Sequence, residues 1–139
     1  MTPSPLARDR RLLFLAATAR DAAATRAMLA PLGITLDVCR TFEALLEEID
    51  AGVGAILLPE EAATSAHNDA LRMVLEAQPP WSDLPVLVLT RPGADSAESG
   101  DAVRTLGNVT LRERPLRMAT LVSAVQTAMR ARDRQYQMR

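Results

Sequence analysis

Leu84-Pro85-Val86-Leu87-Val88-Leu89-Thr90 is the clearest strand signal in this sequence. The run is short, almost wholly apolar and closes on a hydroxyl residue, which is typical of a strand buried on both faces of a parallel sheet. Four similar runs lie at 12–16, 34–38, 55–58 and 108–111. Because segments with helical spacing of apolar residues separate these runs, we predict an α/β fold with a five-stranded parallel sheet covered on both faces.

The helices between the strands have recognisable ends. The segment 21–32 has apolar residues at helical spacing and stops at Gly33, a typical C-cap residue. Thr41 can cap a helix over 42–50. Three more helices are expected, at 68–77 before Pro79-Pro80, at 95–106 and after Pro115.

Composition narrows the possible functions. The 139 residues suit one domain, and the net charge of −1 gives no reason to expect binding to nucleic acid or to an anionic membrane. All 16 basic residues are arginine, which excludes any mechanism that needs a lysine. A single cysteine, Cys39, and the lack of a long apolar stretch are typical of a cytoplasmic domain without membrane insertion.

Thr90, the strand Asn108-Val109-Thr110-Leu111 and the pair Arg114-Pro115 together resemble the fourth and fifth strands of a two-component receiver domain. The resemblance covers about residues 10–131 and implies a three-layer, doubly wound (βα)5 sandwich with strand order 2-1-3-4-5. Residues 80–95, 106–111 and 121–137 are also similar to the receiver-like segment found N-terminal to some bacterial sensor histidine kinases.

The same resemblance locates the phosphorylation site, and there the usual residues are replaced. The two acids that hold Mg²⁺ at the end of strand one correspond to Ala16 and Ala17, and the phospho-acceptor corresponds to Pro59. The remaining family positions are Thr90 for the switch hydroxyl, Leu111 for the switch aromatic, and Arg114 with a cis Pro115 for the Lys-Pro pair. An alanine methyl group offers no oxygen to magnesium, so we expect no metal, no cofactor and no phosphoryl transfer.

Two alternatives keep some chemistry at this site. Glu60, next to Pro59, could act as a displaced acceptor or imitate a phosphorylated aspartate, although a solvated acid is the simpler expectation. Arg114 could bind a small anion in the emptied crevice, which would make the domain a ligand sensor.

His67 is expected to be exposed in a loop, and Cys39 is expected to be a buried residue that fills space in the core. Trp81 should anchor its loop to the sheet edge or present a contact surface.

The C-terminal segment predicts a protein contact. Val122, Val125, Met129, Arg132 and Tyr136 follow the spacing of a coiled-coil seam, and we expect nothing in the domain to cover the part beyond Met129. We therefore expect a polar or disordered arm at 1–10, a receiver-like domain at 11–131 and a helical extension at 132–139 that leads to a further region. The predicted function is a homodimerising, phosphorylation-independent pseudo-receiver that regulates a sensor histidine kinase.

Overall fold

The computed structural model describes residues 9–15, 19–62, 64–90, 109–113 and 118–138. Five strands form one parallel sheet in the order β2-β1-β3-β4-β5. The strands are β1 (Leu12–Leu15), β2 (Leu36–Cys39), β3 (Ala55–Pro59), β4 (Val86–Thr90) and β5 (Val109–Glu113). The sequence prediction of an α/β fold with a parallel sheet is confirmed, and each strand lies within a few residues of its predicted run.

Four α-helices and two short 3-10 helices accompany the sheet in the described ranges. The α-helices are α2 (Ala19–Leu29), α3 (Phe42–Asp50), α4 (Ser65–Glu76) and α6 (Met118–Gln137), and the 3-10 helices are η1 (Ala30–Leu32) and η2 (Glu60–Ala62). Helix α3 has its predicted bounds, because the Thr41 side chain accepts a hydrogen bond from the Ala44 N–H and so fixes the first turn. Gly33 adopts a φ of 72°, as expected for the residue that closes a helix.

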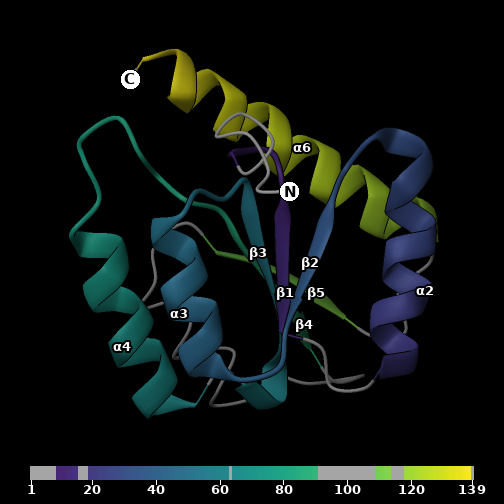
Figure 1. The fold of residues 1–139 in the computed structure, drawn as a ribbon, viewed down its shortest axis with the longest axis horizontal. Coiled ribbons are helices and arrows are strands. Elements are labelled where there is room, and N and C mark those ends of the chain that lie inside the picture. Colours follow the sequence, from purple (N-terminus) through teal and green to yellow (C-terminus); the bar gives the residue numbers. More distant parts are fainter. Residues whose placement is uncertain (1–8, 16–18, 63, 91–108, 114–117, 139) are drawn as a thin grey trace.

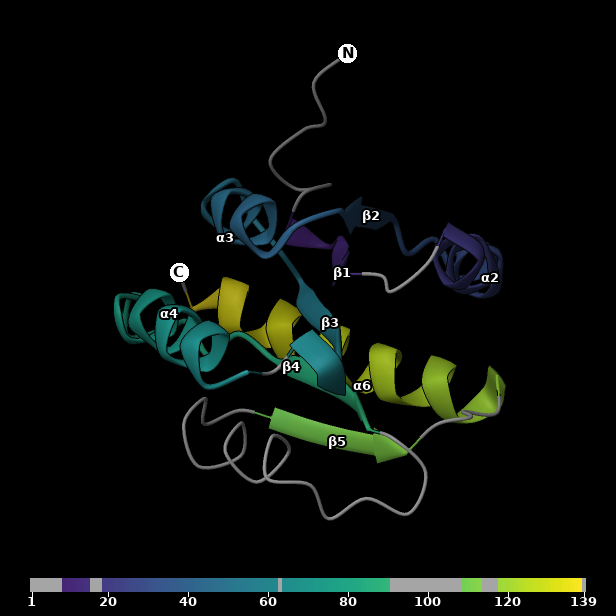
Figure 2. The same cartoon turned by 90° about the horizontal axis from the view of Figure 1, so that it is seen from below.

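Each face of the sheet has its own apolar core. Helices α3 and α4 cover one face through Phe42, Leu45, Leu71 and Leu75, while α2 and α6 cover the other through Leu29, Leu121 and Val125. Figure 1 shows the sheet between these helices, and Figure 2 shows α3 and α4 on one side with α2 and α6 on the other. The three-layer arrangement places the end of α6 at the edge where the strands begin (Figure 1).

The predicted helix at 95–106 lies outside the described residues, as do residues 1–8 of the predicted arm. Of the predicted arm, Asp9 is described, and its side chain is buried against the domain. Within the described ranges, none of the helices has the length and apolar character required to span a bilayer.

Candidate functional site

The carboxyl ends of the strands meet at one edge of the sheet, which is where open α/β sheets bind ligands. There β3 ends at Pro59, whose register partner on β4 is Leu89. Thr90 follows Leu89 at the end of β4 and is buried, and Glu60 follows Pro59 at the start of η2. The structure therefore brings the predicted acceptor position and the predicted switch hydroxyl to the ends of neighbouring strands.

Glu60 corrects one sequence prediction. Its side chain is 0% exposed, whereas the sequence favours a solvated acid at this point. The reason is the 3-10 turn η2, which begins directly at the end of β3 and folds back against β4. A carboxylate that is closed off from water is poorly placed to receive a phosphoryl group from a donor in solution.

Four of the predicted site residues lie outside the described residues: Ala16, Ala17, Arg114 and Pro115. The expected cis bond and the anion site at Arg114 stay predictions. Leu111 lies in β5, paired in register with Val88 of β4, and only its backbone is described. A leucine at this position has no aromatic ring that could rotate between two states.

His67 is a second correction, because it lies in a helix instead of a loop and is only partly exposed. It lies in the first turn of α4, where its ring stacks on Phe42 with centroids 4.0 Å apart and an interplanar angle of 8°. Its Nδ1 lies 2.8 Å from the carbonyl oxygen of Ala62, and since a carbonyl only accepts, Nδ1 carries the proton. The histidine thus ties α3, η2 and α4 together beside the carboxyl edge.

The opposite edge of the sheet holds a polar network around Arg132 that the sequence does not reveal. The Arg132 side chain, in a residue only 5% exposed, donates from Nε to the Val53 carbonyl at 3.1 Å. Its Nη1 donates to the hydroxyl of Ser82 at 2.6 Å and its Nη2 to the hydroxyl of Tyr136 at 3.2 Å. The guanidinium also lies 4.4 Å from the centroid of the Tyr136 ring and 5.5 Å from that of Trp81.

The network overturns the predicted coiled-coil seam on α6. Val125 is 0% exposed within the domain core, Val122 and Met129 pack against that core, and Tyr136 donates to the Val53 carbonyl at 2.7 Å. These residues share a helical face as predicted, but that face covers the chain's own sheet. The expectation that nothing covers α6 beyond Met129 is wrong, because the segment before β3 and the loop before β4 provide the contacts.

The main chain of the loop before β4 is also held to α6, by hydrogen bonds to a side chain of that helix. Gln135 accepts a hydrogen bond from the Asp83 N–H at 2.7 Å and donates to the Asp83 carbonyl at 2.8 Å. Trp81 is half-buried, with its ring 5.2 Å from that of Tyr136. Trp81 therefore anchors its loop to α6, which is one of its two expected roles, and it stays partly exposed.

A second buried arginine, Arg11, joins the start of β1 to α3. The sequence analysis did not predict its burial. Arg11 donates from Nη1 to Asp37 and to Glu48, each at 2.9 Å, and from Nη2 to the Glu48 carbonyl at 2.6 Å. Cys39 is buried as predicted, and burial raises the pKa of its thiol, with Glu48 and Asp37 acting in the same direction against Arg11. The position of Arg11 just before a strand, among several other arginines, gives no sequence signal of its burial.

Comparisons with known proteins agree with this fold. No protein-family model matches the sequence, and a comparison with curated proteins finds no match. Solved structures do match over most of the chain. A response regulator receiver protein from Pseudoalteromonas atlantica is 18% identical, with a TM-score of 0.67 over 86% of this chain and 97% of that one.

Two further matches are instructive. The receiver domain of a sensor histidine kinase from Pseudomonas aeruginosa, solved with a magnesium ion in its active-site cleft, is 18% identical with a TM-score of 0.68, covering 86% of this chain and 97% of that one. The beryllofluoride-activated NtrC4 receiver domain dimer is 15% identical with a TM-score of 0.70, covering 88% and 98%. The chain therefore has a receiver-like fold, in agreement with the resemblance seen in its sequence.

Magnesium does not fit the three residues that the sequence resemblance assigns to the metal and acceptor positions. The ion requires hard oxygen ligands, and Pro59, Ala16 and Ala17 have no side-chain oxygen. In the part of the chain that the structure describes, no three acidic, histidine or cysteine side chains gather in a way that could hold a metal.

Proposed function

We propose that this domain is a pseudo-receiver that works in two-component signal transduction without being phosphorylated, as a regulatory or dimerisation module of a sensor histidine kinase. The observation that carries the proposal is Pro59. It ends β3 in register with Leu89 of β4, at the position where the receiver resemblance requires an aspartate. A proline side chain has no atom that can attack phosphorus.

The burial of Glu60 supports this proposal against the displaced-acceptor alternative. A phosphoryl acceptor must reach its donor in line, and the Glu60 side chain is 0% exposed. It also lies in η2, beyond the end of β3, and not at the acceptor position itself.

The proposed two-component role rests on the receiver-like fold and on the sequence resemblance. A receiver without a phospho-acceptor would act by binding other proteins. The matched structures include a receiver taken from a sensor histidine kinase and a receiver dimer. By analogy we propose that this domain self-associates and regulates a kinase core. Because the seam face of α6 is already buried, self-association would use another surface.

The proposal is tested by titrating the ¹⁵N-labelled protein with Mg²⁺ and then with beryllofluoride while recording amide spectra. We expect no saturable shifts around Pro59, Glu60 and Thr90, because neither an oxygen cage nor an acceptor carboxylate is available. The magnesium-binding receiver from the Pseudomonas aeruginosa kinase, run in parallel, should shift with both additions. Saturable shifts in this protein that disappear in Glu60→Gln would establish the displaced acceptor instead.

A further inference from the structure

A cavity of about 680 Å³ opens at the edge where the strands begin, opposite the edge that holds Pro59 and Thr90. It lies where the last turns of α3 and α4 meet the segment 77–84 and the end of α6, and we call it the α3–α4 notch. The residues of interest along it are Ile49, Asp50, Met73, Pro79 and Trp81. Nothing in the proposed signalling role accounts for this notch.

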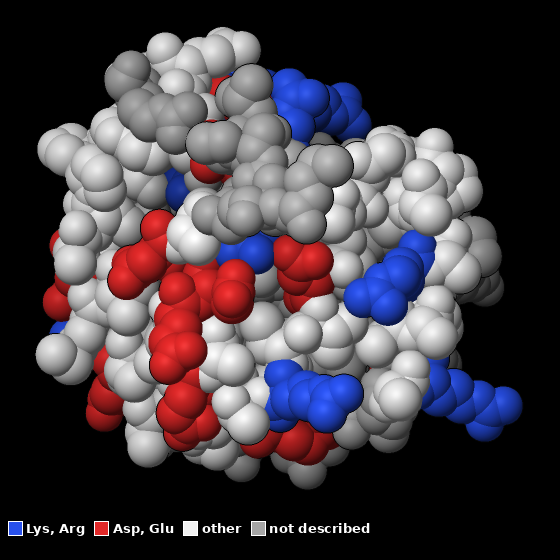
Figure 3. All heavy atoms as spheres, in the orientation of Figure 1, with Lys and Arg blue, Asp and Glu red and all other residues white. Residues whose placement is uncertain are grey.

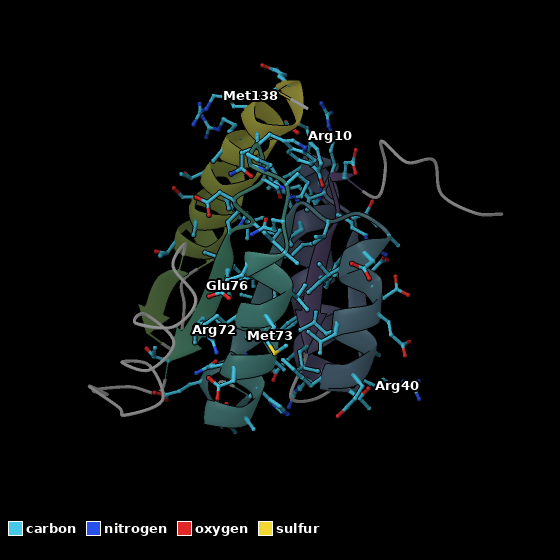
Figure 4. The ribbon with its side chains drawn as sticks, turned by 90° about the vertical axis from the view of Figure 1, so that its left-hand side faces the viewer. Arg10, Arg40, Arg72, Met73, Glu76 and Met138 are labelled. Atoms are coloured by element: carbon cyan, nitrogen blue, oxygen red, sulfur yellow. The ribbon has the colours of Figure 1, made fainter. Side chains whose placement is uncertain are left out.

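The notch has an apolar surface that is partly open to water. Met73 is 67% exposed, which is unusual for a methionine and makes it one of three large exposed apolar side chains among the described residues. Figure 4 shows Met73 on the outer surface of α4, with Arg72 and Glu76 on the side of the helix away from α3. Trp81, which also lines the notch, is half-buried. Methionine and tryptophan side chains are frequent anchors of protein contacts.

The surface that leads into the notch is acidic. Helix α3 carries Glu43, Glu47 and Asp50 at positions i, i+4 and i+7, so they form one exposed stripe, and the helix contains no basic residue. Figure 3 shows acidic side chains gathered over this part of the molecule. The stripe ends at Asp50, which itself lines the notch.

Two helix ends add to the negative potential. The last turns of α3 and α4 both border the notch, and neither contains a basic residue that would compensate its helix dipole. Asp50, the last residue of α3, adds negative charge at that end, whereas Glu76 at the end of α4 is paired with Arg72 at 3.3 Å. Arg11 does reach the Glu48 carbonyl, but from inside the domain, where its charge is paired with Asp37 and Glu48.

Arg132 is the one basic residue among those that line the notch, and its hydrogen bonds point into the protein. They go to the Val53 carbonyl, Ser82, Gln135 and Tyr136. An acidic ligand would therefore have to compete with four existing hydrogen bonds. A cationic ligand meets the acidic stripe and the helix ends directly.

We propose that the α3–α4 notch is a docking site for a basic, amphipathic peptide segment of a partner protein. An apolar side chain of that segment fills the space beside Met73 and Trp81, and its arginine or lysine residues lie along the α3 stripe. This is the helix-in-groove or extended-peptide type of recognition, in which apolar anchors give affinity and charges give orientation. The notch lies at the opposite edge of the sheet from Pro59 and Glu60.

The test uses the full chain, immobilised, to select binders from a phage-displayed random peptide library. We expect enriched sequences to combine arginine or lysine with leucine, methionine or phenylalanine. Synthetic copies of these peptides are then measured by fluorescence anisotropy. Asp50→Arg and Met73→Glu should each weaken binding by at least about tenfold. Both residues are exposed, so circular dichroism melts should show that the variants stay folded.

Matched controls lie on the other layer of the domain. Asp21→Arg on α2 makes the same charge change as Asp50→Arg, and Leu32→Glu replaces another exposed apolar side chain. Both should leave peptide affinity within about twofold. Enrichment of acidic or purely apolar sequences, or equal binding to the notch variants, would overturn the proposal. A loss of self-association in Met73→Glu without any peptide binding would assign the notch to a second copy and would also overturn it.

Discussion

The hydroxyl of Tyr136, near the end of α6, donates a hydrogen bond of 2.7 Å to the carbonyl of Val53, two residues before β3. Residues 83 positions apart in sequence are thereby fixed to each other at the edge where the strands begin. Arg132 donates to the same carbonyl. The last turns of α6 are therefore part of the domain. Any movement of this helix end would have to break the two hydrogen bonds to the Val53 carbonyl.

Arg132 should contribute much more to stability than its neighbour Arg134. Replacing Arg132 with methionine keeps the aliphatic volume but removes the donors to Val53 and Ser82, and we expect a loss of about 2 kcal/mol in the free energy of unfolding. Arg134→Met, at an exposed position on the same helix, should change it by less than about 0.5 kcal/mol. Urea unfolding measures both, and equal effects would contradict the network.

Tyr136 should make stability depend on alkaline pH. Burial raises the pKa of its phenol above the ordinary value of about 10, although the nearby Arg132 guanidinium opposes this. The unfolded chain therefore loses this proton first, so the contribution to stability is complete below pH ~10 and declines as pH rises through the folded pKa. We expect the free energy of unfolding to fall more steeply with pH in the wild type than in Tyr136→Phe. Parallel curves from pH ~8 to ~11 would exclude this linkage.

Gly54 should tolerate alanine less well than Gly33, for different physical reasons. A Cβ on Gly54 would lie 2.5 Å from the Met129 sulfur and 3.0 Å from the Arg11 carbonyl oxygen, and that oxygen also accepts the Gly54 N–H. We expect a loss of about 2–3 kcal/mol for Gly54→Ala. Gly33 has open space around it and only a positive φ of 72°, so alanine there should cost about 1 kcal/mol. Thermal melts of the two variants would show the order, and the reverse order would be inconsistent with this packing.

Cys39 should react slowly with thiol reagents in the folded protein. Its thiol is buried, and burial raises its pKa, so little thiolate is present near neutral pH. We expect alkylation by iodoacetamide at pH ~8 to be on the order of 100-fold slower in the native state than in denaturant. Comparable rates in the two states would mean that the β2 edge opens readily.

Local signals in the sequence predicted the fold well. Helix α3 has the bounds expected from Thr41 and the apolar spacing after it, and Gly33 closes its helical segment with the expected conformation. Both features depend on hydrogen bonds or dihedral angles within a few residues. For the same reason β4 could be recognised from its apolar run alone.

The misjudged residues depend on contacts that are distant in sequence. The spacing of α6 predicts Arg132 on an exposed helix seam, but its partners Val53 and Ser82 lie at least 50 positions away in sequence. The sequence favours a solvated Glu60, but the fold of η2 against β4 buries it. Helical spacing shows which residues share a face, but not whether that face meets the same chain or another.

The most direct test of the central claim is the intact mass of the protein after incubation with Mg²⁺ and acetyl phosphate. Because Pro59 cannot accept a phosphoryl group and Glu60 is buried, we predict a single unmodified species at every time point, while an active receiver treated alongside becomes phosphorylated. An acid-stable but alkali-labile phosphorylated species, lost in Glu60→Gln, would contradict the account.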